Sequence, residues 1–329
     1  MRAGGTGIRV LLAGASTPDG RALREKLEGS ALPVAKLLLR DPGEAGLLTE
    51  FRGEPLLSTP LAPEALEEAD LAFLCGEPEG LAALQLRAAA GTTPVVSLAP
   101  PGPGAPCGPH VWPGQGAALP AGGLVYVPGS AACLLLRLLR PLHREAGVAE
   151  AAGIVLRSVW EEGPEGLDAL LAQSVALLNM RAAPRDVLRE QRAFNLLPLG
   201  PDERSARQVE AVLGLPVGAV RLGCVAAPCF HGTAVAVWAR AGREIPPAEA
   251  ERLLREEPGV AVGEGEEVSP VAAAGLAEVR CLAPVPSGGG FWLWGAADPV
   301  SAGAAAEALR VAEAMLGGRG TAAGEGRCG

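Results

Sequence analysis

Short apolar runs alternate with amphipathic stretches through the first hundred residues of the chain. Ile8 to Ala13 is an apolar run that ends at Gly14, and the apolar residues of Gly20 to Leu27 share one helical face. The same reasoning predicts further strands over 34–39, 71–75, 95–98 and 124–127, and a helix over 80–90. Short strands separated by helices predict a parallel, doubly wound sheet of the Rossmann-like α/β class.

The pattern changes after about residue 148. Strands are predicted over 151–160, 220–229, 233–240, 278–282 and 291–297, and helices over 165–180, 246–257 and 301–316. These strands look antiparallel and few helices separate them, so we expect an α+β second domain. Residues 99–123 are rich in Pro and Gly, which predicts an irregular crossing, and 317–329 are predicted to be a disordered tail.

Composition and charge exclude several classes of protein. The chain has 329 residues, enough for two domains, and its net charge of −9 with no basic run disfavours nucleic-acid binding. Arg137 and Arg140 interrupt the most apolar stretch, so no membrane span is expected, and the first residues lack a signal-peptide core. The seven Cys are scattered and the three His form no zinc pattern. We expect a cytoplasmic protein without a metal site.

A glycine loop, GASTPDG over 14–20, joins the first predicted strand to the first predicted helix. In a dinucleotide-binding fold, glycines at this place let a pyrophosphate approach the helix N-terminus. Gly14 and Gly20 stand where such a loop needs them, whereas Thr17 adds bulk and Asp19 adds negative charge. The loop therefore fits a cofactor site and a plain strand-to-helix turn about equally well.

The candidate cofactor residues are those of the loop and one arginine beyond the second strand: Gly14, Ser16, Thr17, Gly20 and Arg40. An arginine at that place suits a 2′-phosphate. It is also a normal solvated residue at a strand end.

A second glycine-containing turn leads into the helix that starts near residue 130. The segment VPGSAACLLLRLLRPL places Ser130 at the head of the helix and Cys133 one turn later. A thiolate at a helix N-terminus is activated, so the question is which residue stands there. The spacing favours Ser130, which looks like a helix N-cap, with Cys133 as a small buried residue.

Several segments in order resemble the aspartate-semialdehyde dehydrogenase family. The segments are IRVLLAGASTPDG, EADLAFLCGEPEG, YVPGSAACLLLRLLRPL, GLDALLAQSVALLN, RAFNLLPL, CVAAPCFHGTAVAV, EEPGVAV and FWLWGAADPVSAGAAAEALRVAEAM. The sequences of these segments look most like those of the Usg-type paralogues, which lack the catalytic cysteine. The resemblance implies an NADP-binding domain over 1–128 plus 300–316. It also implies a catalytic and dimerisation domain over 129–299.

The family's chemistry needs a cysteine nucleophile, a glutamine, an arginine that holds the substrate carboxylate and a histidine that moves the proton. Carried over by position, these four places are occupied here by Ser130, Arg157, Ala226 and Thr233. Glu203 matches an acidic residue of the substrate helix, and Asp298-Pro299 stands for a later Asp-Asn. All four catalytic positions therefore depart from the family pattern.

Two alternatives remain open at these positions. Cys133 and His231 would form a displaced dyad, if the helix and the strand each place them toward the site. Arg157 is either an added anion contact or an ordinary arginine at a strand edge.

The resemblance and the substitutions together predict a catalytically inactive, homodimeric binding or regulatory protein that binds NADP weakly or not at all. The alternative is an active NADP-dependent aspartate-semialdehyde dehydrogenase that uses Cys133 and His231.

Overall fold

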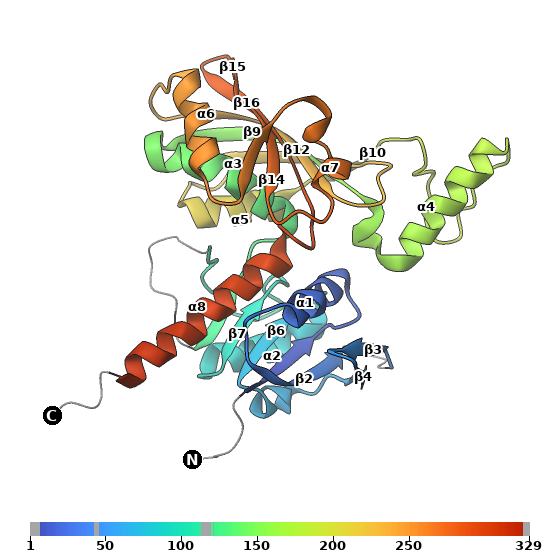
Figure 1. Ribbon diagram of the computed structural model, residues 1–329, viewed down its shortest axis with the longest axis vertical. Coiled ribbons are helices and arrows are strands. Elements are labelled where there is room, and N and C mark those ends of the chain that lie inside the picture. The colour runs from blue at the N-terminus through green and yellow to red at the C-terminus, as the bar shows by residue number, and fades with distance from the viewer. Residues whose placement is uncertain (1–6, 43–45, 113–119, 121, 325–329) are drawn as a thin grey trace. The chain divides into compact units, whose positions relative to one another are not determined.

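The structure is a computed structural model and describes residues 7–42, 46–112, 120 and 122–324. The chain divides into two compact units. Met1–Val127 and Ala304–Gly329 form unit 1, and Pro128–Gly303 form unit 2. Each unit has its own large sheet (Figure 1).

Unit 1 alternates strands and helices along the chain. Its strands are β1 (Ile8–Ala13), β2 (Val34–Asp41), β3 (Leu48–Phe51), β4 (Glu54–Leu57), β5 (Thr59–Pro60), β6 (Leu71–Leu74), β7 (Pro94–Ser97) and β8 (Gly123–Tyr126). Its helices are α1 (Pro18–Glu28), the 3₁₀ helix η1 (Pro63–Glu68), α2 (Pro78–Ala90) and α8 (Ala304–Gly324).

The sheet of unit 1 is parallel and has the order β5-β2-β1-β6-β7-β8. The chain leaves β1 toward β2 on one side and reaches β6 on the other, so the strand order reverses beside β1. Ligands of such sheets bind at this switch point, beyond the carboxyl ends of the strands. The helix α8 packs on α1 and β7, which buries the sheet on that face.

Unit 2 begins with a helix and then builds a larger sheet. Its strands are β9 (Val148–Arg157), β10 (Leu197–Pro201), β11 (Val220–Ala226), β12 (Thr233–Ala241), β13 (Val260–Gly263), β14 (Val279–Leu282), β15 (Val285–Ser287) and β16 (Gly290–Ala297). Its helices are α3 (Ser130–Ala146), η2 (Val159–Glu162), α4 (Gly163–Leu178), α5 (Glu203–Leu213), α6 (Pro247–Glu256), η3 (Gly265–Glu267) and α7 (Pro270–Ala273).

The sheet of unit 2 is mixed, with the order β10-β11-β9-β12-β16-β14-β13, and β15 pairs with β16. The strands were expected to be antiparallel, but β9 pairs with β11 and β13 with β14 in parallel. Helical segments connect both of these pairs, and such crossovers return the chain in the same direction. The α/β class with a Rossmann-like first part and an α+β second part is confirmed.

Several element boundaries differ from those expected. The sequence analysis missed the β3–β4 hairpin and the short β5, because their polar residues give no continuous apolar run. The last helix was expected to end at 316, with a disordered tail over 317–329. α8 instead runs to Gly324, since no proline interrupts it. Residues 325–329, and residues 113–119 and 121 of the predicted crossing, lie outside the described residues.

Gly14 allows the closest backbone approach at the switch point. It has φ of +80°, and a Cβ added there would lie 1.8 Å from the carbonyl oxygen of Cys75, just after β6. A side chain at residue 14 would therefore separate two adjacent parallel strands.

We expect Gly14→Ala to lower the free energy of unfolding of unit 1 by about 3 kcal/mol, through left-handed backbone strain and the clash. Urea unfolding with hydrogen exchange in β1 and β6 measures this. Gly29→Ala is the matched control: it ends α1 at a negative φ and has open space for a Cβ. Equal stabilities of the two variants would contradict the expectation.

Candidate functional site

The loop between β1 and α1 uses its own polar groups. Thr17 is the N-cap of α1, and its Oγ1 accepts a hydrogen bond from Gly20 N at 3.1 Å and donates one to Gly14 O at 2.7 Å. Pro18, the first helical residue, has no N–H. At the N-terminus of α1, the N–H of Gly20 is thus already bonded and Pro18 has none. Neither residue can donate a hydrogen bond to a pyrophosphate.

Asp41, at the carboxyl end of β2, faces this loop. Its Oδ1 accepts hydrogen bonds from Ser16 N at 2.9 Å and from Ser16 Oγ at 2.8 Å. The residue is only 2% exposed, and its Oδ2 is buried without a hydrogen-bond partner in the described structure. A buried carboxylate oxygen of this kind attracts a hydrogen-bond donor and repels an anion.

Arg40 does not take the place that was suggested for it. Its Nη2 pairs with Glu68 Oε2 at 3.1 Å, and its Nη1 donates to Leu39 O at 3.2 Å. A 2′-phosphate at the end of β2 would meet the Asp41 carboxylate, while Arg40 is engaged with a carboxylate of its own. The 2′-phosphate of NADP therefore does not fit the residues at this place.

In unit 2, three of the four family positions lie side by side at one end of the sheet. Arg157 on β9 is in register with Ala226 on β11 and with Thr233 on β12. Ala226 and Thr233 are each 1% exposed, and Thr233 Oγ1 is buried with no partner among the described groups. The strand register thus places these three residues next to one another.

Arg157 is held by two carboxylates. Its Nη1 pairs with Glu161 Oε2 at 2.9 Å and its Nη2 with Asp202 Oδ2 at 2.8 Å. Asp202 is buried and caps α5, accepting from Ser205 N at 3.1 Å. Burial alone would lower the pKa of Arg157, but the two carboxylates raise it above its ordinary value. Arg157 lies on a central strand, so it is not a strand-edge residue, and both of its Nη groups contact carboxylates of the chain itself.

Ser130 and Cys133 occupy the first turn of α3. The N-cap is Gly129, whose N–H donates to Gln208 Oε1 at 3.0 Å, so Ser130 is the first helical residue and not the cap. Ser130 Oγ lies against Gly303, where an added Cβ would come within 2.5 Å. Cys133 is fully buried and its Sγ donates to Pro128 O at 3.1 Å. A thiol in that setting is packed as an apolar residue.

His231 forms a pair with Asp298. Its Nε2 lies 2.9 Å from Asp298 Oδ2, and its ring meets Trp160 edge-on with centroids 5.9 Å apart. Asp298 also accepts hydrogen bonds from the backbone N–H groups of Gly275, Val300 and Ser301. Burial would raise the pKa of Asp298, but the bonds from His231 and from the backbone hold it at about 2. The described partner of His231 is thus Asp298, not Cys133.

The sequence analysis missed three polar partners at these places: Asp41, Asp202 and the contact of Asp298 with His231. Asp41 carried a usable signal, because an acidic residue at the end of the second strand marks a ribose contact in dinucleotide-binding folds. Asp202 carried a local signal as the N-cap of α5, three residues before Ser205. Its pairing with Arg157 and the His231–Asp298 contact carried none, because those partners are remote in sequence.

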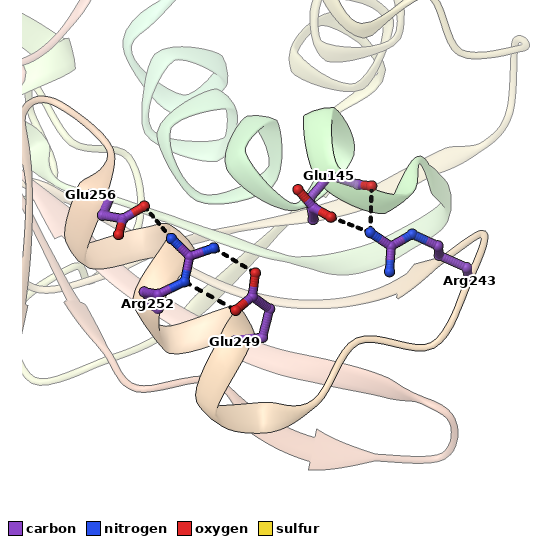
Figure 2. Close-up of polar contacts among 5 residues, drawn as sticks. All are labelled: Glu145, Arg243, Glu249, Arg252 and Glu256. Carbon is purple, nitrogen blue, oxygen red and sulfur yellow. Dashed lines mark hydrogen bonds and ion pairs between the residues drawn. The ribbon is translucent and has the colours of Figure 1, made fainter.

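A hollow of ≈ 710 Å³ lies beside the β12–α6 connection and the β15–β16 turn. Its arginines are paired: Arg240 with Glu150 and Arg243 with Glu145. Figure 2 shows the second of these pairs together with Arg252, which bridges Glu249 and Glu256 on α6. Hydrogen bonds from Arg252 lower the pKa of Glu249. Exposed pairs of this kind contribute little to stability, and they leave this hollow without an unpaired arginine among its described residues.

The described part of the chain contains neither a candidate metal cluster nor a helix that could span a membrane. No cluster of three His, Cys, Asp or Glu residues with metal-binding geometry occurs there. None of the described helices is long and apolar enough to cross a bilayer.

Comparisons with known proteins find similar sequences and a solved structure of similar fold. The chain is 28% identical to a USG-1 protein homolog of Azotobacter vinelandii, over 94% of this chain and 98% of that protein. It is 24% identical to the aspartate-semialdehyde dehydrogenase of Aquifex aeolicus over the same shares. A solved structure of a probable aspartate-semialdehyde dehydrogenase from Pseudomonas aeruginosa superposes with a TM-score of 0.83 and 26% identity, covering 94% of this chain and 99% of that one. No protein-family model matches the chain.

The Asp298 carboxylate makes the stability of unit 2 depend on pH. Its pKa is about 2 in the folded protein against an ordinary 3.8, so the stabilisation is complete above pH 4 and is lost as the pH falls toward 2. We expect a loss of roughly 2 kcal/mol over this interval. Urea unfolding followed by tryptophan fluorescence measures it.

Asp298→Asn removes this pH dependence, and His231→Ala reduces it. The exposed Asp186→Asn is the control and keeps the wild-type profile. Identical profiles for Asp298→Asn and the wild type would contradict the assignment.

Proposed function

We propose that this chain, which belongs to the aspartate-semialdehyde dehydrogenase family, is a catalytically inactive member that acts as a dimeric binding or regulatory protein. One observation carries the proposal: the in-register strand ends hold Arg157, Ala226 and Thr233 where the family's chemistry needs glutamine, arginine and histidine. On this proposal the chain keeps the fold of the similar solved structures, while the side chains that perform the reaction are replaced.

Each replacement removes a separate chemical function. Ser130 has a hydroxyl instead of a thiolate, and a hydroxyl is a weak nucleophile unless an adjacent base activates it. The methyl group of Ala226 has no charge with which to hold a carboxylate. Thr233 has no group that exchanges protons near neutral pH. Arg157 is engaged by Glu161 and Asp202 and does not position a reacting centre.

The alternative function, an active dehydrogenase using Cys133 and His231, has one observation in its favour. Asp298 orients the imidazole of His231, as carboxylates do for catalytic histidines. Two observations count against it: Cys133 is fully buried, and its Sγ donates to Pro128 O. A thiol with no exposed surface is not accessible to a substrate carbonyl.

The cofactor proposal follows from the loop. The resemblance implies NADP, but Thr17 caps α1 with its own hydroxyl and Asp41 places a carboxylate near the 2′-position. We infer that NADP binds weakly or not at all.

The homodimer proposal rests on an apolar surface of unit 2. α4 buries one face against η2 and the following loop, where Gln173 donates to Pro184 O and accepts from Arg192 N. Its other face and the segment behind it are exposed, and α4 stands away from the sheet of its unit (Figure 1). This α4 patch consists of Leu171, Val175, Leu178, Met180, Phe194 and Leu196. Several exposed apolar side chains on one helix and the segment that follows it are typical of a subunit interface.

We expect the purified protein to show no NADPH formation with aspartate semialdehyde, phosphate and NADP. The rate should be at least about 10⁴-fold below that of a member with all four residues, because residues that act as a unit fail together. Ser130→Cys should not restore activity, since Ala226 and Thr233 remain.

The assay includes the Aquifex aeolicus dehydrogenase as a positive control and the variants Cys133→Ala and His231→Ala. Turnover by the wild type that both variants lose would establish the alternative function. Turnover that neither variant changes would indicate a contaminating enzyme.

The α4 patch predicts the assembly. We expect a dimer of the 33.3 kDa chain in sedimentation at micromolar concentration. Leu171→Glu combined with Leu178→Glu should weaken association by about 100-fold or more, because it buries charge in an apolar interface. Val271→Glu is the matched control, since Val271 is an exposed apolar residue on α7 outside the patch. A wild-type monomer, or a dimer that the double variant leaves intact, would refute the assignment.

A further inference from the structure

We infer that the β1–α1 loop of unit 1 is a site for an adenosine ribose with a free 2′-hydroxyl, and that it rejects the 2′-phosphorylated form. The inference deepens the cofactor part of the proposed function: it names which nucleotide chemistry the loop accepts. It also reverses the selectivity that the family resemblance implies, because the resemblance points to NADP.

The position of Asp41 carries the argument. Asp41 ends β2, next to the strand-order reversal beside β1, where a parallel sheet of this order holds the adenosine half of a dinucleotide. A carboxylate at that place accepts hydrogen bonds from ribose hydroxyls. Asp41 is 2% exposed, so desolvation strengthens both the attraction of a donor and the repulsion of an anion.

Among the described groups, only one of the two carboxylate oxygens of Asp41 has a hydrogen-bond donor. Ser16 N fixes Oδ1 at 2.9 Å, and Oδ2 is buried with no partner among the described groups. Buried polar atoms in folded proteins nearly always have a partner, so an unpaired carboxylate oxygen needs an explanation. A ligand hydroxyl supplies the missing donor.

The exposed Ser16 offers a ligand hydroxyl a route to the Asp41 carboxylate. Its hydroxyl donates to Asp41 Oδ1 at 2.8 Å, and the residue itself is exposed. We read this hydroxyl as a stand-in for the ribose hydroxyl: it can turn outward when a ligand arrives, while the backbone N–H keeps the carboxylate in place. The exchange replaces one O–H···O⁻ bond by another and adds a donor for Oδ2.

Two arginines near the loop each have a described partner. Arg40 pairs with Glu68 and donates to the backbone of Leu39. Arg21 Nε donates to Ser16 O at 2.9 Å. These two arginines are the groups that would produce the opposite selectivity, so the experiment must weigh them against Asp41.

The test compares ADP-ribose with ADP-ribose 2′-phosphate, which differ only in the phosphate, by titration calorimetry on the full-length protein. We expect ADP-ribose to bind at least tenfold more tightly. Equal or tighter binding of the 2′-phosphate form would overturn the inference in favour of Arg21 and Arg40. Binding of neither compound up to millimolar concentration would overturn it in favour of a plain strand-to-helix turn.

Three variants assign the effect to named groups. Asp41→Asn should weaken ADP-ribose binding and reduce the discrimination, because it removes the charge and keeps the shape. Ser16→Ala should leave ADP-ribose binding unchanged or tighten it, since the competing hydroxyl is gone, and it keeps the test valid should Asp41→Asn fold poorly. Glu25→Gln, an exposed residue on α1, is the charge control and should behave as the wild type.

The outcome is independent of the activity assay. Turnover of aspartate semialdehyde would refute catalytic inactivity and leave the ribose preference to be decided by calorimetry. Preference for the 2′-phosphate form would refute the ribose site and leave catalytic inactivity standing.

Discussion

The ion pair between Arg157 and Asp202 is the interaction on which the altered centre of unit 2 depends. Asp202 is buried at the N-terminus of α5, where the helix dipole and Ser205 N already favour its charge. A buried carboxylate still needs a compensating cation, and Arg157 supplies it from the end of β9. The pair joins the central strand to the helix that follows β10. The residue at position 157 is therefore part of the packing of the unit, whatever the unit binds.

The same dependence limits which side chains position 157 can hold. Replacing Arg157 by glutamine, the residue that the resemblance implies there, would leave Asp202 buried with no cation from β9, and removing one partner of such a pair is strongly destabilising. A glutamine at position 157 would therefore require a second change at Asp202. Positions 226 and 233 are also filled by small buried side chains, so larger polar residues there must displace neighbours. The side chains at positions 157, 226 and 233 are thus constrained by packing as well as by charge pairing.

The sequence predicted the architecture well because the signals were local and repeated. The β1 run, with Val10 to Ala13 fully buried, and the amphipathic α1 are visible in the residue pattern alone. The parallel β9–β11 pair was not visible, because parallel pairing depends on crossovers that periodicity does not record.

The same limit applies to the two candidate sites. The order of segments along the chain was enough to match Ser130, Arg157, Ala226 and Thr233 to the four catalytic positions that the resemblance implies. Their mutual placement needed the sheet register, since Arg157 meets Thr233 only through the antiparallel pairing of β9 with β12. Contacts between residues far apart in sequence, such as His231 with Asp298, leave no periodic trace.

The polar groups of both candidate sites are largely satisfied from within the chain. Thr17 caps the helix that would face a pyrophosphate, Ser16 occupies one oxygen of Asp41, and Asp298 holds His231. A ligand at either place must compete with an internal hydrogen bond of similar strength, so it gains little from any donor or acceptor that is already paired. Binding energy is then concentrated on the few groups left unsatisfied. In unit 1 such a group is Asp41 Oδ2, and in unit 2 such groups are Arg157 Nε and Thr233 Oγ1. The first is a carboxylate acceptor and Arg157 Nε is a guanidinium donor, so the two places favour ligand groups of opposite kind: a donor at Asp41 and an acceptor at Arg157.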